Sequence, residues 1–121
     1  MRLLAWFLVI LVAIGCGGCA DGPSTANGSL EVTGTYEGGF ESSFFVPCGT
    51  AETWWVEADP AFQQQYAALV TRDYEPVFIR MRGDRSALGT YGHQGLAVRE
   101  FVVKEVLEMR LAISTDCISQ E

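Results

Sequence analysis

The most prominent hydrophobic feature of the chain is an unbroken apolar block near its N-terminus. Residues 3–14 are all apolar, Arg2 precedes them and Gly15 follows. A short positive segment, an apolar block and small residues, in this order, are typical of a secretory signal peptide. The block is shorter than the roughly 20 residues that a membrane-spanning helix needs. We therefore predict a signal peptide over residues 1–15, with an uncleaved signal anchor as the alternative.

From residue 34 the apolar positions alternate with polar ones, which indicates a β-strand. The Gly38-Gly39 pair interrupts the alternation, and we interpret it as a bulge or sharp bend within one long strand. The strand is expected to end at Pro47. The alternation assigns Tyr36, Phe40, Phe44 and Val46 to one face of this strand, and Thr35, Glu37, Glu41 and Ser43 to the other.

A second strand is predicted over residues 51–57, where Trp54 and Val56 share one face and Trp55 lies on the other. A helix follows, because Asp59 is suited to cap a helix and Pro60 to be its first residue. Its apolar stripe consists of Phe62, Tyr66, Leu69 and Val70 at helical spacing, and Arg72-Asp73 is its expected end.

Two more strands complete the pattern. Pro76 opens the first of them, with Val77, Ile79 and Met81 inward and Phe78, Arg80 and Arg82 outward. Gly83-Asp84 is expected to turn the chain into a glycine-rich loop or hairpin over residues 84–97. The last strand, residues 99–111, has a spacing that also permits a helix. We favour a strand, because β-branched residues crowd a helix and suit a pleated sheet.

Several short strands, one helix and a glycine-bent first strand predict a mainly β fold, a small barrel like the oligonucleotide/oligosaccharide-binding (OB) fold. That barrel normally has its helix after the third strand, whereas the pattern predicts only two strands before it. Either the long first segment contributes two strands or the barrel is a variant. The predicted organisation is a signal peptide at 1–15, a tether at 16–33 and an OB-like domain at 34–121.

The net charge of the chain disfavours a nucleic-acid partner. The chain has 15 acidic and 8 basic residues. Removing residues 1–15 takes away only Arg2, so 15 acidic residues remain against 7 basic ones, a net charge of −8. Nucleic-acid affinity depends on basic patches. We therefore expect no nucleic-acid partner, although the OB fold would suggest one.

The residues around Cys16 predict a lipid anchor. Ala13-Ile14-Gly15-Cys16 resembles a lipobox, the site at which bacterial lipoproteins are acylated on cysteine and cleaved just before it. The resemblance implies that acylated Cys16 holds the protein on the bilayer, with Cys19 as the alternative site. Gly17, where an Asp would favour inner-membrane retention, suggests the outer membrane, facing the periplasm. The glycine-rich segment that follows would reach roughly 20 Å as a flexible tether.

The sequence offers little material for catalysis or metal binding. His93 is the single histidine, and no nucleophile motif, phosphate loop or paired metal-ligand motif is present. Cys16 and Cys19 form a CxxC pair without a second ligand pair, and lipidation would consume one sulfur. Glu100, Glu105 and Glu108 are interpreted as a solvated face. We expect no enzymatic activity, no catalytic residue, no metal and no cofactor.

The aromatic side chains are the candidates for ligand contact. OB folds stack bases or sugars on aromatic rings, so Trp55, Phe78 and Tyr91 are candidate ligand-stacking residues. Packing is the favoured interpretation, because large aromatic residues in small domains are mostly structural. Trp54 is assigned to the core, and Trp55 is expected to cover the barrel under the helix or against Phe78.

The order of motifs resembles a known family. Phe45-x-x-Cys48-Gly49, Trp54-x-Val56, the helix, Pro76-Val77 and a terminal Cys117 resemble the C-terminal OB domain of the envelope lipoprotein NlpE over about residues 40–117. The resemblance implies an OB fold, an envelope location and a disulfide between Cys48 and Cys117. An exported domain lies in an oxidising compartment, where a structural disulfide between paired cysteines is also the ordinary expectation.

We therefore predict a small membrane-anchored envelope lipoprotein, a non-catalytic binding or scaffold module whose partner is an envelope protein or glycan. The alternative is an NlpE-like envelope-stress or metal-responsive sensor. The copper-linked N-terminal domain of NlpE-like proteins has no room in this chain, so copper binding and stress signalling are not carried over. A purely structural accessory role is the third hypothesis.

Overall fold

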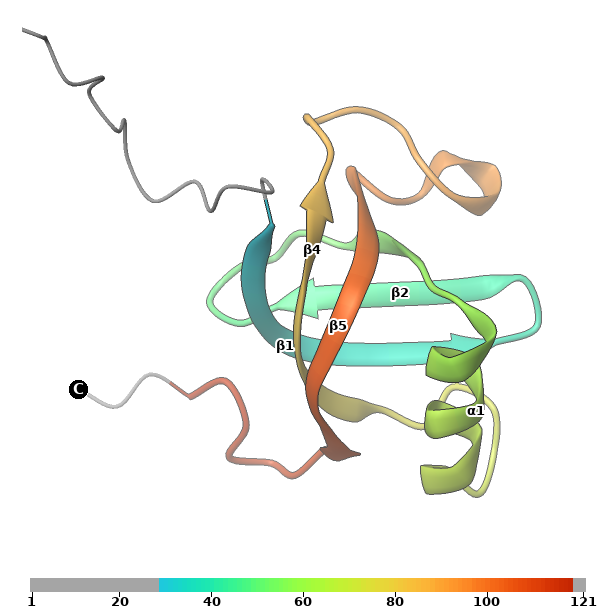
Figure 1. Ribbon diagram of the computed structural model, residues 1–121. Helices are drawn as coiled ribbons and strands as arrows, with labels where there is room; N and C mark the ends of the chain where they lie inside the picture. Colours follow the sequence, from blue (N-terminus) through green and yellow to red (C-terminus); the bar gives the residue numbers. More distant parts are fainter. Residues whose placement is uncertain (1–28, 119–121) are drawn as a thin grey trace, which may run out of the picture.

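The computed structural model describes residues 29–118, which form a closed five-stranded barrel with one helix (Figure 1). The strands are hydrogen-bonded in the order β1-β2-β3-β5-β4, and β4 returns to β1. This arrangement confirms the predicted OB-like barrel. The elements are β1 (Leu30–Gly39), β2 (Ser42–Pro47), β3 (Trp54–Glu57), α1 (Pro60–Leu69), β4 (Val77–Arg85), a 3₁₀ turn (His93–Gly95) and β5 (Arg99–Leu111).

The long β5 strand closes the barrel. Its first residues pair with β3 in parallel, and most of its length pairs with β4 antiparallel. Two irregularities in the β4–β5 register, after Arg80 and after Arg82, mark bulges. Bulges bend a strand and increase its twist. Because β5 bends in this way, it can pair with both β3 and β4 and so close the barrel.

The first predicted strand is two strands, so three strands precede the helix, as in other OB barrels. The chain reverses after Gly39, and Glu41 in the turn has φ of 53°. The predicted bulge is therefore a hairpin turn, and the predicted faces beyond it were wrong. Residues opposite each other in an antiparallel pair lie on the same face, and Tyr36 is opposite Phe45. Phe45 is fully buried, whereas Phe40 is 77% exposed.

The sequence predicted a turn at Gly83-Asp84, and this prediction is wrong. Gly83 lies inside β4. A side chain at this position would overlap the Val102 carbonyl oxygen and lie 2.8 Å from the Phe101 ring. The glycine therefore permits close contact between β4 and β5, and β4 runs on to Arg85. The inward positions Val77, Ile79 and Met81 are fully buried, as predicted.

The barrel begins earlier in the sequence than predicted. Leu30 pairs with Gly83 and Thr33 with Arg80, so residues 30–33 are part of β1. The sequence assigned these four residues to the tether because Gly, Ser and Asn dominate the stretch before them. Their strand structure depends on pairing with β4, which lies about 50 residues later and leaves no local signal.

Helix α1 covers one end of the barrel and begins as predicted. The Asp59 side chain accepts a hydrogen bond from the Phe62 backbone N–H at 2.9 Å, and Pro60 is the first helical residue. The helix ends at Leu69, before the predicted Arg72-Asp73. Val70 is already extended, and Glu75 accepts a hydrogen bond from the Thr71 N–H at 2.9 Å, which holds the chain in a turn.

The core lies between the barrel wall and α1. Phe62 and Tyr66 of the helix contact Tyr36 of β1 edge-on, with ring centroids 5.0 and 5.1 Å apart. Ten mutually packed buried residues make up this core: Tyr36, Phe45, Trp54, Val56, Phe62, Tyr66, Val77, Ile79, Met81 and Phe101.

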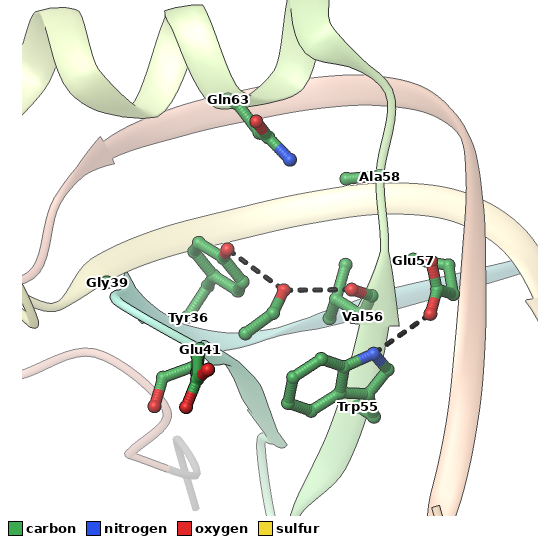
Figure 2. A pocket seen from close by; sticks show the side chains of 10 residues that line it. Tyr36, Gly39, Glu41, Trp55, Val56, Glu57, Ala58 and Gln63 are labelled. Carbon is green, nitrogen blue, oxygen red and sulfur yellow. Dashed lines mark hydrogen bonds between the residues drawn. The ribbon is translucent and has the colours of Figure 1, made fainter. Parts of the chain in front are cut away.

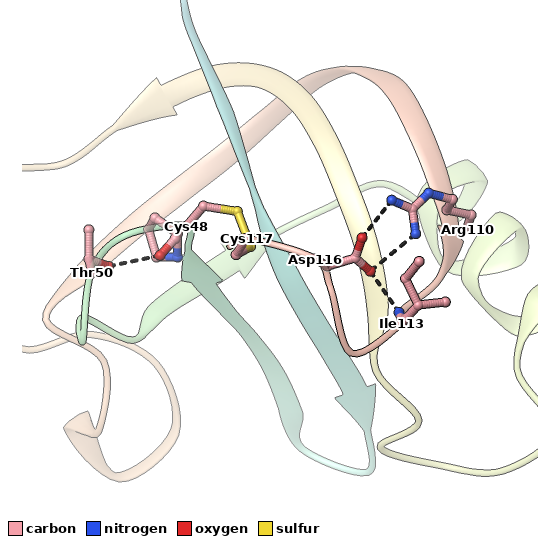
Figure 3. Close-up of a disulfide and its surroundings, with 7 residues drawn as sticks. Cys48, Thr50, Arg110, Ile113, Asp116 and Cys117 are labelled. Carbon is pink, nitrogen blue, oxygen red and sulfur yellow. Dashed lines mark hydrogen bonds and ion pairs between the residues drawn. A yellow bond between two sulfur atoms is a disulfide. The ribbon is translucent and has the colours of Figure 1, made fainter. Parts of the chain in front are cut away.

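The implied disulfide is present between Cys48, after β2, and Cys117, after β5 (Figure 3). A neighbouring ion pair orders the segment that carries Cys117. Asp116 accepts two hydrogen bonds from Arg110, at 2.7 and 3.1 Å, and a third from the Ile113 N–H at 2.7 Å. The Arg110 hydrogen bonds hold the pKa of Asp116 below its usual value.

Candidate ligand-binding site

Two adjoining cavities lie between α1, the β1–β2 hairpin and β3, with volumes of about 230 and 270 Å³. We call them together the hairpin groove. Five residues line both cavities and so define the groove: Tyr36, Gly39, Ser42, Ser43 and Gln63. In Figure 2, Gln63 extends from the helix toward the hairpin, above Tyr36. Cavities of this size accept part of an extended ligand rather than a whole drug-sized molecule.

A short hydrogen-bond chain forms the floor of the hairpin groove. The Ser43 hydroxyl donates to the Val56 carbonyl oxygen at 2.8 Å, and the Tyr36 and Ser43 hydroxyl oxygens are 3.0 Å apart (Figure 2). Since the Ser43 proton is engaged by Val56, Tyr36 is the donor to Ser43. Burial raises the pKa of Tyr36, so its hydroxyl stays protonated at neutral pH. The floor is thus polar and uncharged.

Trp55 forms one wall of the hairpin groove. Its indole Nε1 donates to Glu57 at 3.0 Å, and its ring contacts Phe44 edge-on, with centroids 5.5 Å apart. The loop between β4 and β5 covers part of the ring. Gly92 lies so close that a side chain there would be within 2.6 Å of the ring carbons. Trp55 is therefore largely a packing residue whose remaining surface lines the groove.

The other two predicted stacking residues do not join Trp55 in one site. Tyr91 precedes Gly92, but its hydroxyl donates to the Ala87 carbonyl oxygen at 3.0 Å, which folds the ring onto its own loop. Phe78 is on β4, two strands away from β3, and the Arg110 guanidinium lies 4.3 Å above its ring. Among the described residues, no ring contact joins Trp55 to Phe78, which the sequence had offered as one expectation. The ring that contacts Trp55 is that of Phe44.

Sequence reasoning missed Ser43 and Gln63 as groove residues. Ser43 was assigned to the solvated face because the turn at Glu41 was not recognised, and this turn inverts the side-chain alternation. Gln63 belonged to the polar side of the predicted helix, and the sequence does not indicate which polar helix residue borders a neighbouring hairpin. The Gly38-Gly39 pair was the one available signal for a turn.

The charge of the hairpin groove is negative. Glu41, Glu57 and Asp73 line it, and its described lining contains no lysine or arginine. His93 on the β4–β5 loop is exposed, and its Nε2 lies 3.5 Å from a Glu41 carboxylate oxygen. An acidic groove with a polar floor suits a ligand that is uncharged or cationic and repels phosphate.

Within residues 29–118 no group of three or more histidine, cysteine or acidic side chains is placed to hold a metal ion. No helix in the same range is long and apolar enough to span a bilayer. The predicted signal peptide, the lipidation site Cys16 and its alternative Cys19 lie outside the described residues.

Comparison with known proteins identifies a family. The family model described as the NlpE C-terminal OB domain matches residues 26–118. The match begins close to the first strand and ends just after Cys117, so it spans the whole barrel and both cysteines of the disulfide. No curated protein and no solved structure gave a significant match.

Proposed function

Because the chain belongs to the family of the NlpE C-terminal OB domain, a domain of an envelope lipoprotein, we propose that it is a lipid-anchored binding module of the bacterial cell envelope. The family is not a known enzyme family, which supports a non-catalytic role. The lipobox-like sequence before Cys16 supports acylation at that residue. Thirteen residues, 17–29, then separate the anchor from β1.

The ligand that we propose is a polypeptide segment of an envelope protein carrying lysine or arginine. The observation that carries this proposal is the hairpin groove, which is lined by Trp55, three carboxylates and a polar floor and has no lysine or arginine in its described lining. The aromatic edge offers apolar contact and the carboxylates attract positive charge. The hydroxyl groups of a glycan could donate to the same floor and carboxylates, but an uncharged glycan lacks the ion-pair attraction that a lysine or arginine gains.

The test compares charged probes. The mature chain is titrated with a short lysine-rich peptide, an uncharged peptidoglycan glycan fragment and a glutamate-rich peptide, and the amide signals of residues 36–43 are followed by NMR. We expect saturable shifts with the lysine-rich peptide. Removing two carboxylates, Glu41→Gln with Glu57→Gln, should weaken binding about tenfold, since exposed charge contacts contribute up to about 1 kcal/mol each.

A matched control removes two carboxylates from the outer face of β5, Glu105→Gln with Glu108→Gln, and should leave the affinity unchanged. Equal effects of the two double variants would mean that net charge, not the hairpin groove, determines binding. Tighter binding of the glycan would replace the peptide by a cell-wall partner. A metal titration of the same sample tests the sensor hypothesis, which requires saturable binding of a transition metal.

The anchor is tested separately by mass spectrometry of the N-terminal peptide from membranes. Acylation is expected on Cys16. The Cys19→Ser variant should remain acylated, and the Cys16→Ser variant should lose both acylation and membrane retention. Acylation that survives Cys16→Ser and disappears in Cys19→Ser would move the anchor by three residues.

A further inference from the structure

A cavity separate from the hairpin groove, of about 460 Å³, opens at the end of the barrel opposite to α1. The start of β1, the end of β2, the start of β3, the end of β4 and the start of β5 surround it. We call it the open-end cavity. Its apolar lining comes from Leu30, Val32, Pro47 and the edge of Trp54, and two arginines, Arg85 and Arg99, border it. Its volume is within the range of small-molecule sites.

Arg85 is exceptional among the basic residues of the described chain. Lys104 and every other arginine in residues 29–118 have a carboxylate within 4 Å. Arg85 has no such partner, and its guanidinium stands 5.8 Å from the centre of the Trp54 ring. In a chain with a large excess of acidic residues, an unpaired arginine at a cavity mouth is a site where an anion would be favoured.

Arg99 has unused donor capacity in the same cavity. Its side chain is only 18% exposed, and Nη1 donates to the Ser86 carbonyl oxygen at 2.8 Å. Its Nε is shielded from solvent and lacks a hydrogen-bond partner, because Glu52 is 3.6 Å away and accepts instead from the Trp54 Nε1 at 2.8 Å. A buried donor without a partner costs free energy and requires an explanation.

The acidic residues of the cavity are already engaged. Glu52 is shared between Arg99 and Trp54, and Glu31 lies 3.3 Å from Arg80 and 3.9 Å from Arg82 on the outer face of the barrel. Arg85 is therefore the one charged side chain of the described cavity lining that has no oppositely charged partner. Charges elsewhere on the acidic domain are screened beyond roughly 8–10 Å at physiological salt. The overall negative charge does not cancel this local attraction.

We propose that the open-end cavity binds a small carboxylic acid with an apolar body. The planar carboxylate matches the forked donors of a guanidinium, which exposed Arg85 supplies, and Arg99 adds positive charge at the cavity wall. The apolar body would lie against Leu30, Val32 and Pro47. This site is at the opposite end of the barrel from the hairpin groove, so the two proposals stand independently.

The experiment uses the full chain in detergent micelles and three probes. Benzoate carries both features, benzamide has the same shape without the charge, and inorganic phosphate is an anion without an apolar body. Binding is followed by NMR of the Trp54 indole N–H and the Arg85 Nε–H. We expect saturable shifts with benzoate at millimolar concentrations and at least about tenfold weaker binding of the other two probes.

The variants separate the site from general charge effects. Arg85→Gln should weaken benzoate binding about tenfold, whereas Arg72→Gln, which removes an exposed arginine from the segment after α1, should change it less than about twofold. Glu41→Gln in the hairpin groove should have no effect. Arg85 is exposed and unpaired, so its replacement leaves the fold intact. No saturable binding of benzoate, equal binding of benzamide or phosphate, or an unchanged Arg85→Gln affinity would overturn the proposal.

Discussion

At the scale of single residues, neighbouring phenylalanines on β2 have opposite roles. Phe45 is fully buried and contacts Trp54, with ring centroids 5.7 Å apart. Phe44 lies on the outer face against Trp55. Phe45→Ala should lower the free energy of unfolding by about 3–5 kcal/mol, the usual cost of removing a buried aromatic ring. Phe44→Ala is the matched control and should cost clearly less. Urea unfolding of both variants measures the difference, and a larger loss for Phe44→Ala would mean the opposite register for β2.

Phe44 and Phe45 also indicate which strand faces can be predicted from the sequence alone. Alternation identified the inward residues of β3 and β4 correctly, since each strand is short and uninterrupted. It failed between Gly39 and Val46 because one unrecognised turn changes the face of every residue after it. The turn has Phe40 and Glu41 at its tip, without the Asn-Gly or Asp-Gly that marks tight hairpins. Local sequence therefore could not separate a bend from a reversal.

Asp116 makes the stability of the C-terminal segment depend on pH. Hydrogen bonds from Arg110 and the Ile113 N–H hold its pKa below the usual value. A carboxylate with a lowered folded-state pKa stabilises the fold fully above its unfolded-state pKa, and the contribution disappears as the pH falls through the folded-state pKa. Wild-type protein should thus be more stable than Asp116→Asn at neutral pH, and the difference should shrink in acid. Thermal unfolding across pH 2–7 measures it, and a difference independent of pH would contradict this role.

At the scale of elements, the β4–β5 loop controls how much of Trp55 is exposed. Gly92 has φ of 71° and contacts the indole ring, so Gly92→Ala adds both backbone strain and a steric overlap. Gly49→Ala is a matched control, because Gly49 has φ of 79° and open space around it. We expect about 1 kcal/mol of destabilisation from the backbone in both variants. Only Gly92→Ala should shift the tryptophan emission to longer wavelength, as the loop moves away. Identical spectra would mean that the loop does not cover Trp55.

The composition of the candidate sites depends on the strand order, which the sequence did not predict. The sequence named Trp55, Phe78 and Tyr91 together as candidate ligand-stacking residues, and of these three Trp55 lines the hairpin groove. The strand order determines which residues come together, and β5 lies between β4 and β3 in the barrel. The open-end cavity was missed for a related reason. Arg85 and Arg99 belong to different strands, and only barrel closure brings them to one rim.

At the scale of the whole molecule, a small barrel depends on a covalent link between its first half and its C-terminus. Cys48 and Cys117 are 69 residues apart, and the segment after β5 adds few buried contacts of its own. A domain of this size buries a modest core. The disulfide and the Arg110–Asp116 pair therefore attach the chain end to the barrel where packing does not.

The disulfide contributes to the stability of the barrel but is not part of its core. Replacing both cysteines, Cys48→Ala with Cys117→Ala, should lower the free energy of unfolding by about 4 kcal/mol, because a cross-link over so long a loop restricts the unfolded chain. The barrel itself should persist, since its ten-residue core contains neither cysteine. Urea unfolding measures the stability, and NMR shifts of Phe45 and Phe101 report the fold of the core. A single replacement, Cys48→Ala, should be equally destabilising and leaves one free thiol for labelling. Loss of the core signals at low temperature would show that the disulfide determines the fold and does not merely stabilise it.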